Sequence, residues 1–301
     1  MTAMEGLLNV YQISLLTTLA VAVIMALSLN LITGFCGQIS LGHAAFQGIG
    51  AYMAEILTKQ AGFDFASATL IAVLFSAGIG FLVGLASLRV REDFLAITTM
   101  GVAFLFVGFV NQQPRLGAEE GIANIPDPGL GATGYMVMAL VLALLVALFS
   151  VYVRRTWLGA AFGSIADDED TARIVGIDVA RFKLAAFVMG TGLAGLAGSI
   201  YAHQVKIIQA TDFGFIPSIT VLSIVVFGGI GSIVGVIFAA VLLTMLPLWF
   251  QFIGDYKLLF YGGLLFLMMR FAPQGLAGLI RSGLDAMRRD KRNDARVGDA
   301  A

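Results

Sequence analysis

Apolar residues run through this sequence in long blocks that charged residues seldom interrupt. No Asp, Glu, Lys or Arg occurs between Glu5 and Glu55, or between Asp212 and Asp255. Each block is far longer than the roughly 20 residues that one helix needs to cross a bilayer, so each must hold two passes with a turn or break between them. We therefore predict an all-α, polytopic membrane protein with about nine transmembrane passes: 11–33, 43–58, 66–88, 93–110, 134–153, 184–202, 214–228, 233–250 and 257–270.

Composition and charge support this prediction and orient the chain. The sequence is 59% hydrophobic and 12% charged, whereas soluble proteins carry about 25% charged residues. Fourteen of the eighteen Lys and Arg residues lie in the loops 88–93, 154–183 and 270–301. The positive-inside rule places these loops in the cytoplasm, so we expect the N-terminus outside and the C-terminus inside. The net charge of −1 gives no reason to expect a nucleic-acid partner, and the expected surroundings are membrane lipid.

Both charge-free blocks contain a cluster of glycines and small polar residues near their middle. The clusters read "GFCGQIS" at 34–40 and "FGGIGSIVG" at 227–235. Glycine permits the unusual dihedral angles of a broken helix, and broken backbone at membrane depth is tolerated only where protein buries it or a water-filled cavity reaches it. We predict two glycine-broken hairpins in matching places, which indicates a possible parallel internal repeat.

These breaks are also the candidate lining of a solute path. The alternative is a plain hairpin on the cytoplasmic side with satisfied polar groups. The candidate path residues are Asn30, Gly34, Gly37, Gln38, Ser40, Gly42, His43, Gln47, Gly228, Gly229, Gly231 and Ser232.

Other glycines occur at spacings typical of tight helix packing. Gly80 and Gly84 form one such pair, and Gly190, Gly195 and Gly198 follow later in the chain. Small residues at these spacings let helices in a membrane approach closely. We interpret these glycines as packing positions.

One substantial loop lies on the predicted cytoplasmic side, between Arg154 and Lys183. It reads "RRTWLGAAFGSIADDEDTARIVGIDVARFK". Asp167 can cap a short helix, acidic residues fill the first turn and Gly176 can end it. The pattern predicts a short helix outside the membrane, although the residues alone fit a solvated connector equally well.

Three stretches of the chain resemble one known family. They are "LNLITGFCGQISLGHAAFQGIGAY", "LGAAFGSIADDEDTARIVGIDVARFKLAAFVMGTGLAGLAGSIYA" and "PSITVLSIVVFGGIGSIVG". They are similar to the permeases of branched-chain amino acid ABC importers, and the resemblance covers most of residues 10–280. It implies a transmembrane permease domain at 1–280, a cytoplasmic tail at 281–301 and a location in a bacterial inner membrane.

In that family the loop motif forms the coupling helix, which docks on the cytoplasmic ATPase. Members often carry arginine where this chain has Ala160, Gly163 and Ala166. By position, the resemblance assigns the coupling element to Gly159, Ala166, Asp167, Glu169, Ala172, Gly176 and Ile177.

The resemblance implies ATP-driven import of apolar amino acids by alternating access. The implied partners are two cytoplasmic ABC ATPase subunits, a second homologous permease and an extracytoplasmic solute-binding protein. We expect no catalytic residues, cofactor or metal site in this chain. It has one cysteine, Cys36, and no Gly-Lys dipeptide for a phosphate-binding loop, so ATP hydrolysis is expected on another subunit.

Other functions fit the same residues. A urea or short-amide ABC permease and a stand-alone channel for small neutral solutes remain open. A membrane-embedded enzyme is a more distant third, because no catalytic constellation occurs.

Overall fold

The structure is a computed structural model, and it describes residues 9–88, 94–249, 256–271, 275 and 278. Apart from residue 275 and residue 278, the predicted cytoplasmic tail and the segment before it lie outside the described residues. The helices are α1 (Val10–Leu29), α2 (His43–Glu55), α3 (Phe65–Leu88), α4 (Phe94–Gln112), α5 (Gly131–Arg155), α6 (Trp157–Asp167), α7 (Glu169–Ile174), α8 (Val179–Val205), α9 (Phe215–Gly228), α10 (Ile233–Trp249) and α12 (Lys257–Phe271).

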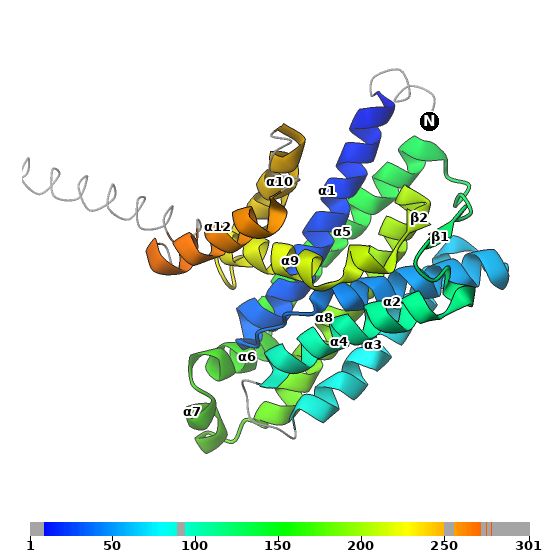
Figure 1. Cartoon of the computed structure of the whole chain (residues 1–301). Coiled ribbons are helices and arrows are strands. Elements are labelled where there is room, and N and C mark those ends of the chain that lie inside the picture. The colour runs from blue at the N-terminus through cyan, green and yellow to red at the C-terminus, as the bar shows by residue number, and fades with distance from the viewer. Residues whose placement is uncertain (1–8, 89–93, 250–255, 272–274, 276–277, 279–301) are drawn as a thin grey trace, which may run out of the picture.

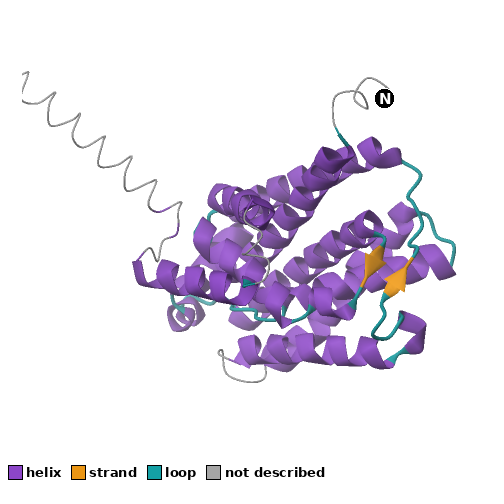
Figure 2. Cartoon of the chain, turned by 45° about the horizontal axis from the view of Figure 1, so that its top comes forward, coloured by secondary structure: helices purple, strands orange, loops and turns teal. Residues whose placement is uncertain are grey.

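Short elements lie between or continue these helices (Figure 1). Two strands pair antiparallel, with Ile122 opposite Ile208. Figure 2 shows the strands together at one side of an otherwise helical molecule. The short elements are the π-helical turns η1 (Asn30–Phe35) and η2 (Ile56–Gln60), the 3-10 turns η3 (Pro114–Leu116) and η4 (Ala210–Phe213), and the strands β1 (Ile122–Ala123) and β2 (Ile207–Ile208).

Local sequence explains where several of these helices begin and end. Helix α5 ends in Arg154 and Arg155, whose charges interact favourably with the negative end of the helix dipole. Helix α8 begins after Asp178, whose side chain accepts a hydrogen bond from the backbone N–H of Arg181 at 3.2 Å. The same helix ends at Val205, and the next residue, Lys206, adopts the left-handed conformation with φ 61°.

Each of the nine predicted apolar runs falls on a helix, but the helices differ in length. Six segments are long and apolar enough to cross a membrane, which supports the all-α, polytopic prediction. The apolar helices α10 and α12 are shorter, and α2 has 13 residues before it continues into η2. The nine passes and the internal repeat therefore stay predictions. The six long segments are Val10–Phe35, Phe65–Ser87, Phe94–Gln112, Gly131–Arg155, Val179–Val205 and Ala210–Gly228.

The helices form an inner and an outer group. In the most apolar stretch of the α1 segment 72% of the residues are buried, against 28% in α4. Helix α8 is also an inner helix and packs against α1, α2 and α3. Helices α3, α4 and α5 expose many large apolar side chains, such as Leu74, Leu105 and Leu144. In a bilayer such side chains contact lipid, so the outer group supplies the lipid-facing surface.

Glycines bring neighbouring helices into close contact, as predicted. A Cβ atom on Gly198 of α8 would overlap the carbonyl oxygen of Gln47 in α2, and one on Gly80 of α3 would overlap the side chain of Thr191 in α8. The Oγ atom of Ser76 in α3 also donates a hydrogen bond to the carbonyl of Thr191, at 2.8 Å. The interpretation of these glycines as packing positions is confirmed.

This packing yields a stability prediction. Gly198→Val should destabilise the protein by roughly 1–3 kcal/mol, because overfilling a close-packed helix contact forces the helices apart. The matched control is Gly78→Val, since a Cβ atom on Gly78 meets nothing within 4 Å. Thermal unfolding in detergent should show a lower midpoint for Gly198→Val than for Gly78→Val. Equal midpoints would show that the α2–α8 contact tolerates a side chain.

Candidate functional site

The first predicted break is a π-helical turn followed by non-helical chain. Helix α1 passes into η1 at Asn30, and residues 36–42 then connect it to α2. The backbone N–H of Gln38 reaches back to the carbonyl of Ile32, at 3.2 Å. Gly37 has φ +73°, a conformation that side chains with a Cβ atom rarely adopt. The glycine cluster of the first charge-free block therefore does break the helix.

The second predicted break joins α9 to α10. Helix α9 ends at Gly228, and Gly229 and Gly231 both have positive φ, at 101° and 79°. The backbone N–H of Ser232 donates to the carbonyl of Gly229 at 2.9 Å. The Ser232 hydroxyl accepts a hydrogen bond from the N–H of Gly235 at 3.2 Å. The helix break at this place is confirmed too.

The two breaks lie against each other, which the sequence did not reveal. The backbone N–H of Gly231 donates to Oδ1 of Asn30 at 2.9 Å. A Cβ atom on Gly34 would lie 2.5 Å from the Gly231 nitrogen, and one on Gly231 would lie 2.9 Å from the Gly34 carbonyl oxygen. Both positions therefore need glycine for the chains to come this close.

The first break also touches the predicted cytoplasmic loop. A Cβ atom on Gly37 would lie 3.1 Å from Cα of Ala166 at the end of α6. The side-chain amide of Gln38 donates to the carbonyl of Lys183, in the first turns of α8, at 2.9 Å. Lys183 in turn forms an ion pair with Glu169 of α7. The break, the middle of the loop at Ala166 and Glu169, and the start of α8 thus form one cluster.

The loop holds two helices, and its cap is one residue later than predicted. Helix α6 comes first, and Asp167 is its last residue. Asp168 caps α7: its Oδ1 accepts from the N–H of Asp170 at 2.9 Å and its Oδ2 from the Thr171 hydroxyl at 2.8 Å. The prediction for Asp167 was wrong because both aspartates suit a cap and only the backbone geometry distinguishes them. Gly176 has φ +90° and follows α7 closely, as predicted.

Several predicted coupling residues face inward rather than outward. Ala172 is buried, and a Cβ atom on Gly159 would lie 2.5 Å from the Val153 carbonyl. Ile177 is half-buried against the core. Ala166, Asp167 and Gly176 are exposed, and Glu169 is half-buried beside Lys183.

The most exposed apolar side chains of α7 and its end were not singled out from the sequence. Ile174 is 85% exposed and Val175 is 69% exposed. A helical pattern in this short segment places Ala172 and Ile174 on different sides of the helix. The pattern does not show which of the two sides faces the rest of the protein.

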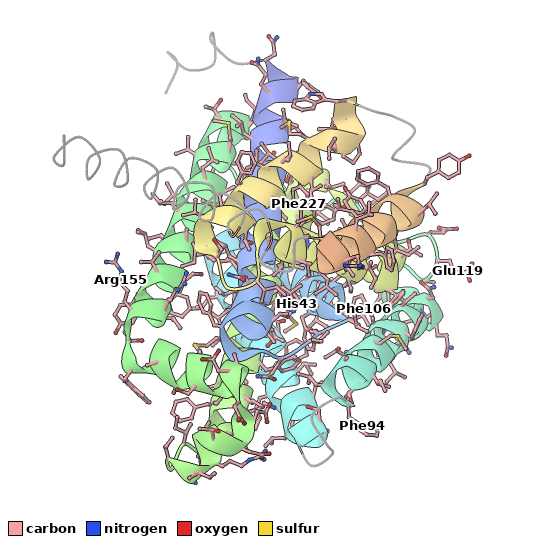
Figure 3. All side chains as sticks on the ribbon, turned by 90° about the vertical axis from the view of Figure 1, so that its left-hand side faces the viewer. His43, Phe94, Phe106, Glu119, Arg155 and Phe227 are labelled. Atoms are coloured by element: carbon pink, nitrogen blue, oxygen red, sulfur yellow. The ribbon has the colours of Figure 1, made fainter. Side chains whose placement is uncertain are left out.

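The remaining path candidates are buried around α2. His43 lies in the interior of the bundle (Figure 3), and its Nε2 is 2.7 Å from the Ser28 hydroxyl of α1. A Cβ atom on Gly42 would overlap the Thr99 carbonyl, and Gln47 lies where α2 meets α8. Within the part of the chain that the structure describes, the Oγ of Ser40, the Nδ1 of His43 and the Nδ2 of Asn30 have no hydrogen-bond partner.

Three loops lie together at the side of the molecule away from the cytoplasmic loop, as the charge distribution predicted. They are 59–65, 111–133 and 203–213. The Lys59 ammonium donates to the carbonyl of Ala123 at 2.7 Å, and Lys206 forms a 3.0 Å ion pair with Asp127. The hydrogen bond from Lys206 lowers the pKa of Asp127. Strands β1 and β2 join two of these loops. The charge asymmetry of the sequence thus groups these loops correctly.

Comparison with known proteins identifies the family. Residues 11–269 match the family model for the permease component of branched-chain amino acid transport systems. The chain belongs to this family. It is 32% identical to the high-affinity branched-chain amino acid transport system permease protein LivM of Salmonella typhimurium, over 91% of this chain and 71% of that protein. Its identity to LivM of Escherichia coli is also 32%, over 90% and 71%. The resemblance stated from the sequence is confirmed.

A further relative is named for a different solute. The autoinducer 2 import system permease protein LsrC of Yersinia enterocolitica is 26% identical, over 63% of this chain and 54% of that protein. No solved structure matches the chain. The chain is therefore a permease of an ABC transporter family whose members differ in the solute that their names give.

The Asp168 cap can be tested against its neighbour. Asp168→Ala should speed hydrogen exchange at the amides of Asp170 and Thr171, because both lose their acceptor. Asp167→Ala should leave both exchange rates unchanged, and Asp168→Asn should restore protection.

The same cap should depend on pH. Hydrogen bonds from Thr171 and Asp170 lower the pKa of Asp168. The cap is therefore present above the ordinary carboxyl pKa of about 3.9 and is lost as the pH falls through the lowered value.

Proposed function

We propose that this chain is the membrane-spanning permease subunit of an ABC importer that carries branched-chain amino acids into the cytoplasm. The observation that carries the proposal is the match of residues 11–269 to that permease family. The contact between the two breaks and the loop supports it, because alternating access needs a link between the ATPase side and the path. The two LivM relatives match over more of the chain, and at higher identity, than the autoinducer 2 relative does.

The proposed assembly follows the transport system to which such permeases belong. The assembly contains two cytoplasmic ATPase subunits, one of which docks on the loop 154–183. A second homologous permease lies alongside, and a solute-binding protein delivers the solute from outside. The chain lies in a bacterial inner membrane with its N-terminus outside and its C-terminus in the cytoplasm. ATP is hydrolysed on the ATPase subunits and not on this chain.

The solute path runs beside the two breaks in this proposal. Asn30, Ser40 and His43 are fully buried, so solute passage requires the helices around them to separate. Unpartnered polar atoms on these three side chains would then be available to polar groups of the solute. The glycines of both breaks supply the backbone freedom for that separation.

The ATPase contact combines predicted residues with two that the structure adds. Ala166, Asp167 and Gly176 are exposed and available for docking, with Ile174 and Val175 as apolar anchors. Gly159, Ala172, Glu169 and Ile177 hold the shape of the loop from within. Large apolar side chains exposed outside the membrane are typical of a protein interface.

Transport assays decide between the importer and a stand-alone channel. Proteoliposomes that contain the permeases, the ATPases and the solute-binding protein should accumulate radiolabelled leucine only with ATP. Vesicles with this chain alone should show no leucine or urea flux. Flux through the chain alone, without ATP, would favour the channel.

The docking surface can be tested at its apolar anchors. Ile174→Asp should reduce recovery of the ATPase with the permease, because loss of an interface anchor costs about 2 kcal/mol or more, which exceeds tenfold in affinity. Membrane insertion should stay normal, since the loop is outside the bilayer. The control is Ser164→Asp, which adds the same charge at an exposed position of α6. Unchanged recovery with Ile174→Asp, or equal losses with both variants, would remove Ile174 from the contact.

The orientation can be tested with two cysteine variants. Glu119→Cys in the loop before β1 and Val175→Cys after α7 place exposed thiols at the two ends of the molecule, while the native Cys36 is buried. An impermeant thiol reagent should label Glu119→Cys in intact cells and Val175→Cys only in inverted vesicles. The reverse pattern would invert the proposed topology.

A further inference from the structure

A single side chain supplies the hydrogen bond between the two breaks. Asn30 begins the π-helical turn η1 and is fully buried. Its Oδ1 accepts the hydrogen bond from Gly231 in the second break, while its Nδ2 has no hydrogen-bond partner among the described residues. Only the acceptor of this side chain is thus used, and it joins segments that are 201 residues apart in the chain.

The first break is held on its other side by the loop. Gly37 packs on the backbone of Ala166, and Gln38 donates to the carbonyl of Lys183. Each of these close contacts involves backbone atoms on at least one side. The first break and the loop therefore cannot move far relative to one another without breaking the contacts. Close-packed groups transmit displacement because the interior is not readily compressed. A shift of the loop therefore displaces residues 37 and 38 first.

The second break has no comparable contact with the loop among the described residues. Gly229 packs against Gly275, which follows α12, and Gly231 packs against Gly34. In the described part of the chain, no hydrogen bond or close glycine contact joins the segment 228–232 to the segment 157–178. These contacts therefore lead from the loop to the first break, which meets the second break at the Asn30 hydrogen bond and at the Gly34–Gly231 approach.

We infer that Asn30 is a positioning residue that makes the second break follow the first when the ATPase-bound loop moves. This inference rests on the proposed function, since it takes the loop as the part that ATP moves. Asn30 contributes the acceptor that joins the two breaks, while Gly34 and Gly231 provide the close approach that brings the acceptor within reach.

Two variants separate the acceptor from the size of the side chain. Asn30→Leu keeps the branched shape and the number of side-chain heavy atoms and removes the acceptor. Asn30→Asp keeps an acceptor oxygen and replaces Nδ2, which has no hydrogen-bond partner among the described residues, with a second carboxyl oxygen. Leucine uptake per ATP hydrolysed should fall about two- to tenfold in Asn30→Leu, the factor that corresponds to one ordinary hydrogen bond. Asn30→Asp should recover most of that loss.

Thiol reporters in the two breaks distinguish transmission from a general loss of structure. Cys36 is the single native cysteine and lies in the first break. Ser232→Cys adds a reporter in the second break. In the assembled transporter, N-ethylmaleimide modification of each thiol, read by mass spectrometry, should change when ATP is added. In Asn30→Leu the response should persist at position 36 and disappear at position 232, and Asn30→Asp should restore it.

The outcomes separate this inference from the proposed function. If Asn30→Leu keeps the ATP response at both positions, the breaks do not depend on Asn30 and the inference is wrong. If it loses the response at both, or modification rises at both without ATP, Asn30 only stabilises the fold and the inference is again wrong. If neither thiol responds to ATP in the parent, the proposed ATP-driven function fails, and the inference fails with it.

Discussion

Broken backbone in an apolar environment must find hydrogen-bond partners within the protein, and this constraint organises the structure around its two breaks. A lipid-exposed break would leave peptide groups without partners, at a cost of several kcal/mol for each group. This chain avoids that exposure by placing the breaks against one another. Gly231 finds an acceptor in Asn30, and Gln38 finds one in Ile32. The inner position of α1 and α9 follows, because the helices that carry the breaks must be covered by others.

The division into inner and outer helices has the same origin. Helices α3, α4 and α5 enclose the inner group and turn large apolar side chains outward. Lipid solvates such side chains as well as a protein core does, so hydrophobic burial does not drive these helices together in a membrane. Close contacts at small residues take over that role. Gly80 against Thr191, and Gly198 against Gln47, show how α3 and α2 reach α8.

The sequence predicted those features that are encoded locally. The apolar runs fall on helices, and the glycine clusters fall on the breaks, because hydropathy and backbone freedom are properties of single segments. The contact of Gly34 with Gly231 was not predictable in this way, since it joins segments far apart in the chain. The cap showed a local limit: Asp167 and Asp168 have the same chemistry, and only the extended backbone of Asp168 makes it the cap. Tertiary packing decides which loop residues face outward, so the sequence alone did not identify Ile174 and Val175 as exposed.

The loop shows why a residue can matter to a docking element without touching the partner. A surface that transmits motion must keep its shape, and α7 has only six residues, too few for a stable isolated helix. Its shape therefore comes from contacts beneath it: Ala172 is buried, Glu169 pairs with Lys183, and Asp168 caps the first turn. Small or paired residues face inward so that the helix can lie close to the start of α8, and this leaves Ile174 and Val175 for the outside. Residues of both kinds belong to one element, because the inner contacts fix the position of the outer ones.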